Sequence, residues 1–381
     1  MSEEVHSATT EAIVKREQNS MFWNDHFKLG LFPPNVSGGM TSTAAPERWQ
    51  ATWEQNLKLA QAADRAGLDF LLPASRWIGY GGETGFQRSV LETIPWASAV
   101  LACTERITAF STVYAPLFHP ILAAMQMATI DQIGYGRFGL NVVCGWRPDE
   151  FEMFGTERDW HASRYDRAAE WIELVRGVWT NEDPFDYIGD HYRAIGAQGH
   201  PKPYGGTQPI VMNAGYSEAG RRFAAKHADF FFTNVFNLDD RAARELGAFR
   251  ELAAANGRPD TTICLTAMIV SRDTRAEAEE YLDHYTRRHA DPGAVELIIE
   301  RMEVNVPAGR EAQWRERIAA SSGLGLIIGS HDEVAEQLAA FAAAGYGGAA
   351  VGLVNYLDEL SVVSDEIIPR LEARGVRQPT T

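Results

Sequence analysis

Eight short apolar segments, rich in β-branched and aromatic residues, alternate with longer segments of helical periodicity along most of this chain. A strand followed by a helix, repeated in this way, is typical of a parallel α/β fold. The count of eight favours a closed (β/α)8 barrel, the TIM-barrel fold, over an open sheet. No GxGxxG sequence follows an early strand, so a Rossmann dinucleotide site is not indicated. The predicted strands are residues 27–32, 70–72, 107–114, 138–143, 210–213, 230–233, 262–270 and 348–353.

Three segments fall outside this alternation. The polar N-terminus predicts a loose arm over residues 1–25, followed by a single barrel domain over residues 26–375. Residues 181–204 are rich in Tyr, Asp, Gly and Pro, and are compatible with a hairpin over a loop. Residues 290–323 form a long polar insertion, which we expect to be a lid or an irregular segment near the C-terminal rim of the barrel. The predicted helices include residues 47–66 and 357–374.

The charge and the composition exclude some classes of function. With 35 basic and 51 acidic residues, the net charge is −16, which argues against a general nucleic-acid binder. No segment approaches the roughly 18 uninterrupted apolar residues of a membrane span, and the polar N-terminus is unlike a secretory signal. The cysteines lack CxxC spacing and the histidines lack HExxH spacing, so neither a disulfide framework nor a metal site is predicted. We therefore expect a cytoplasmic protein.

The run of residues 136–151 carries the first candidate site. Residues 138–143 are mostly apolar and lie between glycines, which predicts a buried parallel strand. Asn141 lies in this strand, and Trp146 and Glu150 follow in the next loop. Barrels of this class carry their catalytic groups just beyond the C-terminal ends of the strands. A core strand followed by an ordinary polar loop explains the same residues equally well.

Two further patterns could bind an anion. Residues 214–218 form a glycine-containing turn between a strand and a helix, with Ser217 at the N-cap, where free backbone N–H groups can bind phosphate. Arg164 and Tyr165, at the start of another helix, offer a guanidinium and a hydroxyl. Thr112, in the strand before Asn141, could face the same site. A plain N-cap, a surface arginine and satisfied buried polar groups remain alternative explanations.

Together these residues resemble the bacterial-luciferase-like flavin monooxygenases, in the branch of the pyrimidine and dimethylsulfone monooxygenases. The resemblance covers nearly the whole chain, about residues 27–371. Its most specific segments are residues 122–131 and 136–146, with Glu150 after them. Further matches are residues 164–166, 177–180 and 214–217, and residues 34–39, 79–81 and 233–234 are similar to the dimethylsulfone enzymes in particular.

The resemblance implies a barrel that binds FMN at its C-terminal rim and receives it in reduced form from a separate NAD(P)H:FMN reductase. It implies that Thr112 and Asn141 are catalytic and hold dioxygen. The implied reaction oxidises and cleaves a C–N or C–S bond in a small sulfone or amide-type heterocycle, and the implied assembly is a homodimer or homotetramer. The FMN contacts that it implies are Ser75, Arg76, Asn141, Glu150, Arg164, Tyr165 and Ser217.

Other functions stay open at this point. Some relatives of this branch cleave the ribityl chain of riboflavin, so a lyase that releases lumichrome is the first alternative. A flavin-binding protein without catalysis is the second, although the presence of Thr112, Asn141 and Glu150 argues against it. A deazaflavin-dependent reductase is a further alternative, because that family shares the barrel.

Overall fold

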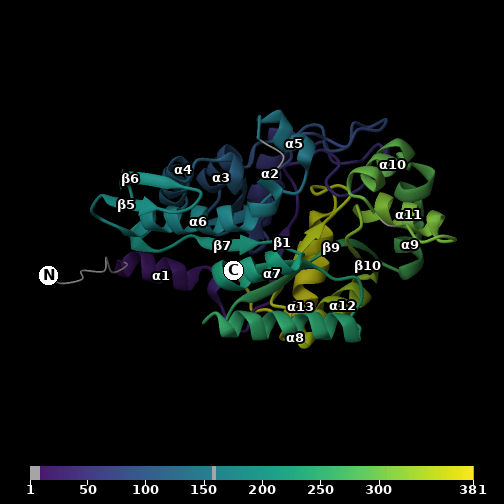
Figure 1. Cartoon of the computed structure of the whole chain (residues 1–381). Helices are drawn as coiled ribbons and strands as arrows, with labels where there is room; N and C mark the ends of the chain where they lie inside the picture. The colour runs from purple at the N-terminus through teal and green to yellow at the C-terminus, as the bar shows by residue number, and fades with distance from the viewer. Residues whose placement is uncertain (1–8, 157–159, 305, 381) are drawn as a thin grey trace. The chain divides into compact units, whose positions relative to one another are not determined.

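Figure 1 shows the computed structural model of the chain, which describes residues 9–156, 160–304 and 306–380. The chain forms two compact units, each assembled from separate stretches of sequence. Unit 1 is drawn from Met1–Trp23, Thr93–Phe232 and Gly247–Thr262. Unit 2 is drawn from Asn24–Glu92, Thr233–Leu246 and Ile263–Thr381.

Unit 1 contains a run of neighbouring strands in the order β3, β4, β7, β8, of which β8 ends in unit 2. Their bounds are β3 (Thr108–Tyr114), β4 (Phe138–Val143), β7 (Ile210–Asn213) and β8 (Phe230–Asn234). The helices are α1 (Thr10–Gln18), α3 (Thr93–Ala102), α4 (Pro120–Ile133), α5 (Pro148–Met153), α6 (Trp160–Thr180) and α7 (Glu218–His227), with short 3-10 turns η1 (Ser20–Phe22), η2 (Ala115–Leu117) and η3 (Tyr204–Gly206). The predicted hairpin is confirmed as the antiparallel pair β5 (Phe185–Ile188) and β6 (Arg193–Ala197).

Unit 2 contains the strands β10, β9, β11, β1 and β2, in that order. Their bounds are β1 (Lys28–Leu31), β2 (Phe70–Leu71), β9 (Thr262–Arg272), β10 (Gly325–Ser330) and β11 (Gly348–Gly352). The helices are α2 (Trp53–Arg65), α9 (Arg275–Asp283), α10 (Pro292–Arg301), α11 (Glu311–Ser321), α12 (His331–Ala344) and α13 (Ile368–Ala373), with π-helical turns η4 (His284–Arg288) and η5 (Val362–Ile367). α8 (Asp240–Ala255) spans a boundary between the stretches of the two units.

The fold is the predicted (β/α)8 barrel. Its eight strands are β1, β2, β3, β4, β7, β8, β9 and β11, and each is followed in sequence by at least one helix. All eight coincide with predicted strands to within two residues. Sequence analysis missed β10, which pairs in parallel with the second half of β9. None of the helices in the described ranges has the length and apolarity of a membrane-spanning segment.

The register of β3 and β4 sets which side chains share a face. Phe110 lies opposite Gly139, and two residues further along Thr112 lies opposite Asn141. Gly139 leaves the space that the Phe110 ring fills, because a Cβ atom at Gly139 would stand 2.4 Å from that ring. Since side chains alternate along a strand, the Thr112–Asn141 pair follows the Phe110 layer on the same face, one step closer to the C-terminal ends of the strands.

The prediction of a loose N-terminal arm is wrong for the part of it that the structure describes. Residues 10–18 form α1, and Thr9 caps this helix by accepting a hydrogen bond from the backbone N–H of Ala12. The Thr9 N–H donates to the carbonyl oxygen of Gly205 at 2.8 Å, and Arg16 donates to that of Gln208 at 3.2 Å. Polar composition does not reveal that a few directed hydrogen bonds can dock a short helix.

The prediction of an irregular insertion is also wrong, because residues 290–323 contain the helices α10 and α11. Ile298 and Ile318 of these helices pack with Tyr80 and Phe86 in one buried cluster. The buried residues are Ala294, Val295 and Ile298 on one face of α10, and the consecutive residues 318–321 at the end of α11.

The predicted helix over residues 47–66 begins only at Trp53. Ala51 has a φ of +57°, a left-handed backbone conformation that interrupts a helix. Thr52 then starts α2 with a capping box, in which its side chain accepts from the N–H of Gln55 and the Gln55 side chain accepts from the N–H of Thr52. The predicted C-terminal helix over 357–374 similarly starts later, and it contains the π-helical turn η5.

Candidate active site

The strands β3 and β4 bring Thr112 and Asn141 together, as predicted from their positions. Asn141 Nδ2 donates a hydrogen bond of 3.0 Å to Thr112 Oγ1, and both side chains are buried. The Thr112 carbonyl oxygen accepts from Thr93 Oγ1 at 2.8 Å, which ties this end of β3 to α3. The hydroxyl and the amide are therefore held in place by the strand register and by a neighbouring helix.

Asn141 has hydrogen-bonding capacity that the described residues do not use. Its Oδ1 atom is buried and has no hydrogen-bond partner within the described part of the chain. Leaving a buried acceptor unsatisfied costs about 1–3 kcal/mol, and such groups are rare in folded proteins. A ligand with an N–H or O–H group at this position would satisfy the Asn141 amide.

The N-terminus of α7 forms the second part of the site. Ser217 caps this helix by accepting from the Gly220 N–H at 3.1 Å, and its Oγ lies 3.2 Å from the hydroxyl oxygen of Tyr165. Gly215 and Gly220 approach so closely that a Cβ on Gly220 would stand 2.6 Å from both Gly215 Cα and the Tyr165 hydroxyl. The two glycines let the turn after β7 pack closely against the start of α7, beside two hydroxyl groups, and a helix start with such donors favours an anion.

Arg164 lies next to this helix start and close to the end of β4. Its guanidinium lies 5.1 Å from the centroid of the Tyr165 ring. Burial raises the pKa of the Cys144 thiol, and the positive charge of Arg164 opposes this shift. The predicted pair of Arg164 and Tyr165 is thus arranged around the loop that follows β4 and the helix that follows β7.

Glu150 is placed deeper than a solvated acid would be. It is fully buried in α5, where its Oε2 accepts from the Tyr114 hydroxyl at 3.2 Å and its Oε1 lies 3.5 Å from the buried guanidinium of Arg147. Arg147 also pairs with Asp149. Sequence analysis missed Arg147 and Tyr114, although acidic residues two and three positions after an arginine are a visible signal for a local ion pair.

Ser75 and Arg76 belong to unit 2 and lie shortly after β2. Ser75 is buried, and Arg76 Nε donates to Gln87 Oε1 at 3.2 Å. Gln87, which sequence analysis missed, donates in turn from Nε2 to the Gly39 carbonyl oxygen at 2.7 Å. Gln87 is buried and has a φ of +55°, so its backbone adopts a conformation that is unusual for a non-glycine residue. The Arg76 side chain is therefore held by the buried side-chain amide of Gln87, a residue whose backbone conformation is strained.

The segment that carries Gln87 is itself tied to α10. Asp291 accepts hydrogen bonds from the backbone N–H groups of Glu83 and Thr84, at 3.1 and 2.8 Å, and from the Thr84 hydroxyl at 2.7 Å. These hydrogen bonds hold the pKa of Asp291 below its usual value although burial opposes the shift. Arg301, at the end of α10, donates to the Gly79 carbonyl oxygen at 2.6 Å. The insertion and the segment after β2 thus form one packed structure within unit 2.

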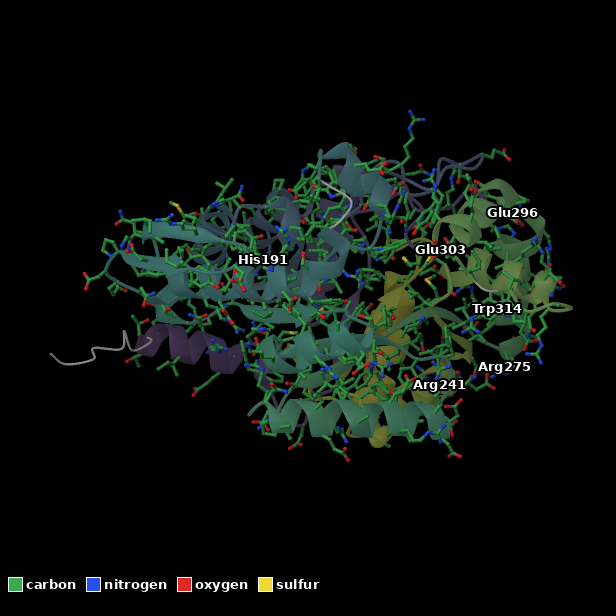
Figure 2. The ribbon with its side chains drawn as sticks, in the orientation of Figure 1. His191, Arg241, Arg275, Glu296, Glu303 and Trp314 are labelled. Carbon is green, nitrogen blue, oxygen red and sulfur yellow. The ribbon has the colours of Figure 1, made fainter. Side chains whose placement is uncertain are left out.

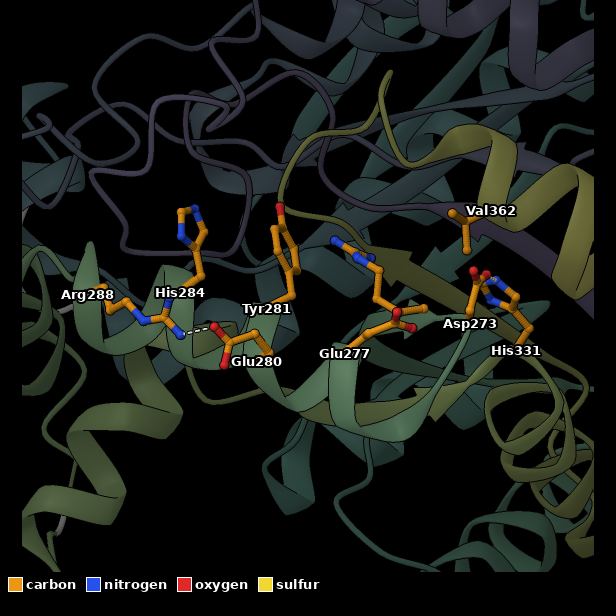
Figure 3. A pocket seen from close by; sticks show the side chains of 9 residues that line it. Asp273, Glu277, Glu280, Tyr281, His284, Arg288, His331 and Val362 are labelled. Atoms are coloured by element: carbon orange, nitrogen blue, oxygen red, sulfur yellow. Dashed lines mark hydrogen bonds and ion pairs between the residues drawn. The ribbon is translucent and has the colours of Figure 1, made fainter.

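A cavity of about 560 Å³ lies elsewhere in unit 2, between α9, α12 and η5. Figure 3 shows its charged side chains, with the Arg288–Glu280 ion pair dashed. His331 lies 3.2 Å from Asp273, and His284 lies 2.9 Å from Glu47. Among the described residues, no buried polar atom of the lining side chains lacks a hydrogen-bond partner, so the cavity does not point to a ligand. None of the predicted site residues lines it.

Comparison with known proteins decides the family. A family model described as luciferase-like monooxygenase matches residues 27–347. The chain belongs to the luciferase-like monooxygenase family. This confirms the family expected from the sequence.

Two kinds of relative in this family are similar to the chain over most of its length. An FMNH2-dependent dimethylsulfone monooxygenase from Pseudomonas fluorescens is 32% identical over 91% of this chain and 96% of its own length. The pyrimidine monooxygenase RutA of Klebsiella variicola is 29% identical over 93% of this chain and 99% of its own.

Two solved structures support the fold. DmoA from Hyphomicrobium sulfonivorans superposes with a TM-score of 0.82 at 20% identity, covering 93% of this chain and 89% of that one. A riboflavin lyase, RcaE, superposes equally well at 22% identity, covering 93% of this chain and 94% of that one. At these identities the likeness concerns the fold alone.

Proposed function

We propose that this protein is the oxygenase component of a two-component monooxygenase, which uses reduced FMN and dioxygen to oxidise a small organic substrate. The observation that carries the proposal is the buried, unsatisfied Oδ1 of Asn141 beside the hydroxyl of Thr112. The family and the FMNH2-dependent relative support the cofactor. Reduced FMN, when bound, supplies the electrons with which dioxygen is activated.

The residues of unit 1 fit the two ends of FMN. At the phosphate end, the N-terminus of α7, the Ser217 and Tyr165 hydroxyls and the Arg164 guanidinium offer N–H, O–H and positive charge to an anion. At the ring end, the Asn141 amide offers an acceptor that is buried and unused. Thr112 fixes the orientation of that amide through its hydroxyl.

The remaining predicted contacts fall into two groups. Glu150 is held by Arg147 and Tyr114, so we propose that it acts by fixing the loop that follows β4. Arg76, held by Gln87, would contribute a second guanidinium, with Ser75 beside it. In the reaction, the Thr112 hydroxyl and the second N–H of Asn141 Nδ2 would hold the oxygen and stabilise the negative charge that develops on it, because preorganised donors in a buried site do this without reorganisation.

We further propose that the reaction cleaves a C–N or C–S bond. The named relatives act on a sulfone and on a pyrimidine, which supports a small substrate with a polarised bond to sulfur or nitrogen. The partner would be an NAD(P)H:FMN reductase.

Oxygen uptake tests the proposal. The purified protein would be supplied with FMN, NADH and a flavin reductase under ¹⁸O2, with dimethyl sulfone, uracil, small sulfonates, amides and riboflavin offered separately. A substrate-dependent product that carries ¹⁸O supports the monooxygenase and identifies the substrate class. Lumichrome formed from riboflavin alone would assign the lyase instead, and uptake that no substrate changes would leave a flavin-binding protein.

We also propose that the protein is a homodimer or homotetramer. Leu122, Met125 and Ile133 leave an apolar strip of α4 exposed, with exposed fractions of 56, 42 and 38%. Apolar strips of this kind are often covered by a partner. Sedimentation that finds only monomers at micromolar concentration would contradict this assembly.

A further inference from the structure

Asn213 is the last residue of β7, and its buried side chain bonds to two backbone segments of unit 1. Its Nδ2 donates to the Val142 carbonyl oxygen of β4 at 2.7 Å, and its Oδ1 accepts from the Gly215 N–H at 2.9 Å. Val142 adjoins Asn141, and Gly215 lies in the turn that leads to Ser217. One buried amide therefore links the strand that carries Asn141 to the turn that carries Ser217.

The strand β4 is the fixed member of this link. It pairs with β3 along its whole length, so its position does not depend on the Asn213 side chain. The backbone register of β4 with β7 ends earlier, where Asn141 lies opposite Met212. The Asn213 amide takes the Val142 carbonyl oxygen one residue beyond that last pair, and the side chain thereby extends the connection between the two strands.

The turn of residues 214–217 is the segment that this amide positions. It joins β7 to α7 (Figure 1), and Figure 2 shows the same view with the side chains drawn. The bond from the Gly215 N–H to Asn213 Oδ1 closes an Asx turn. Gly215 also packs tightly against Gly220 of α7, because a Cβ on Gly215 would stand 2.5 Å from the Gly220 Cα. A turn released from Asn213 would therefore displace the helix start that carries the Ser217 hydroxyl.

We propose that Asn213 is a positioning residue for the phosphate of FMN, which holds the turn before α7 at a fixed distance from Asn141 on β4. This inference rests on the proposed function, in which β4 and the α7 N-terminus hold the two ends of FMN. The ribityl chain between ring and phosphate has a limited length, so an anion site at the wrong distance from the ring loses the phosphate. Riboflavin, which lacks the phosphate, does not need that distance.

The first experiment compares the binding of FMN and riboflavin without turnover. Fluorescence titration of the full-length protein with each oxidised flavin gives two Kd values and their ratio. The wild type should bind FMN more tightly than riboflavin. Asn213→Ala should raise the Kd for FMN about 10-fold, as for loss of hydrogen bonds that preorganise a site, and should change the Kd for riboflavin little. An unchanged ratio of the two Kd values in Asn213→Ala would overturn the inference.

The matched control is Asn234→Ala, at the end of β8. Asn234 makes the same two kinds of bond: its Nδ2 donates to the Gly323 carbonyl oxygen at 3.1 Å, and its Oδ1 accepts from the Gly325 N–H at 3.0 Å. Its loss should lower the melting temperature, as the loss of Asn213 does. It should leave the ratio of Kd values at the wild-type level, because Asn234 bonds to the segment after α11. Equal changes of the ratio in both variants would refute a specific role of Asn213.

Asn213→Ser keeps the experiment decisive if Asn213→Ala fails to fold. A serine hydroxyl can still accept from the Gly215 N–H, although more weakly, but it is too short to reach the Val142 carbonyl oxygen. Because the turn then loses its link to β4, the preference for FMN over riboflavin should fall. A serine variant with the wild-type ratio would mean that the turn needs no link to β4, and it would refute the inference.

Steady-state turnover separates this inference from the proposed function. Asn213→Ala should raise the KM for reduced FMN more than it lowers kcat, because Thr112 and Asn141 stay in register on β3 and β4. If the wild type neither binds flavin nor consumes oxygen, the monooxygenase proposal itself fails. If the wild type does both, and the variant keeps the wild-type KM for reduced FMN, only the role of Asn213 is refuted.

Discussion

The candidate site residues of unit 1 are held mainly by regular backbone, whereas those of unit 2 are held by side chains from distant segments. Thr112 and Asn141 face each other because β3 and β4 pair in register, and Ser217 is placed by the start of α7. Arg76 depends on Gln87, and the segment of Gln87 depends on Asp291 of the insertion.

This difference suggests a division of labour. A strand end or a helix start holds its side chain in place as soon as the fold forms. Unit 1 therefore offers a rigid site for the flavin and oxygen chemistry, which is the same for every substrate. Contacts between irregular segments can change one at a time without disturbing the barrel. We therefore expect variants of the unit 1 site residues to impair oxygen chemistry and flavin binding most, and variants of the unit 2 residues that hold Arg76 to weaken flavin binding less.

The largest effect is expected for Asn141→Ala. Removing an amide that stabilises developing negative charge costs about 100-fold or more in kcat. The fold should tolerate the change, because Oδ1 has no partner in the described structure and the one bond that is lost is the bond to Thr112. The measurement is turnover at saturating reduced FMN, with the melting temperature as the control for folding. Turnover at the wild-type rate would remove Asn141 from the catalytic role.

A pH dependence of stability is expected from His227, at the C-terminal end of α7. Burial, helped by the charges of Lys226, Arg176 and Arg258, lowers its pKa to about 3. Below about pH 6.5 the unfolded chain binds a proton there that the folded protein does not, so folding weakens as the pH falls, by at most about 1.4 kcal/mol per pH unit.

Denaturant unfolding of the wild type and of His227→Gln between pH 5 and pH 8 would test this expectation. The variant should lose less stability than the wild type on acidification. Parallel pH profiles would mean that His227 does not contribute.

A smaller effect is expected for Tyr165→Phe and Ser217→Ala, each of which removes a hydroxyl beside the α7 N-terminus. We expect the Kd for FMN to rise about 3- to 10-fold for each, as for loss of a single hydrogen bond. Ser217→Ala should also destabilise the protein by about 1 kcal/mol, because it loses its cap to Gly220. Fluorescence titration of FMN with both variants and the double variant would measure their coupling. Strictly additive effects would be evidence against a shared ligand group.

The smallest effect is expected for Gln87 in unit 2. Gln87→Gly suits the left-handed backbone at this position but removes the amide that holds Arg76, so the Kd for FMN should rise a few-fold without loss of stability. Gln87→Asn keeps a shorter amide and should also tolerate the backbone, which makes it the matched control. An unchanged Kd for FMN in Gln87→Gly would show that Arg76 needs no such support.

Most of unit 1's candidate site could be predicted, since it follows from local pattern. An apolar run between glycines marks β4 and thus places Asn141, and a serine after a glycine turn marks the N-cap of α7. The prediction failed where a few contacts outweigh composition: α1 is polar yet docked, and Ala51 breaks a helical pattern through its backbone conformation alone.

The sequence by itself determined the barrel, the strands that build it and the family, because periodicity and turn residues act over short distances. Only the tertiary structure decided that Gln87 holds Arg76 and that Asp291 holds the segment that carries Gln87. Arg76 and Gln87 are separated by 11 positions along the chain, and Thr84 and Asp291 by 207, and no local pattern reports which of these distant groups will meet in the folded protein.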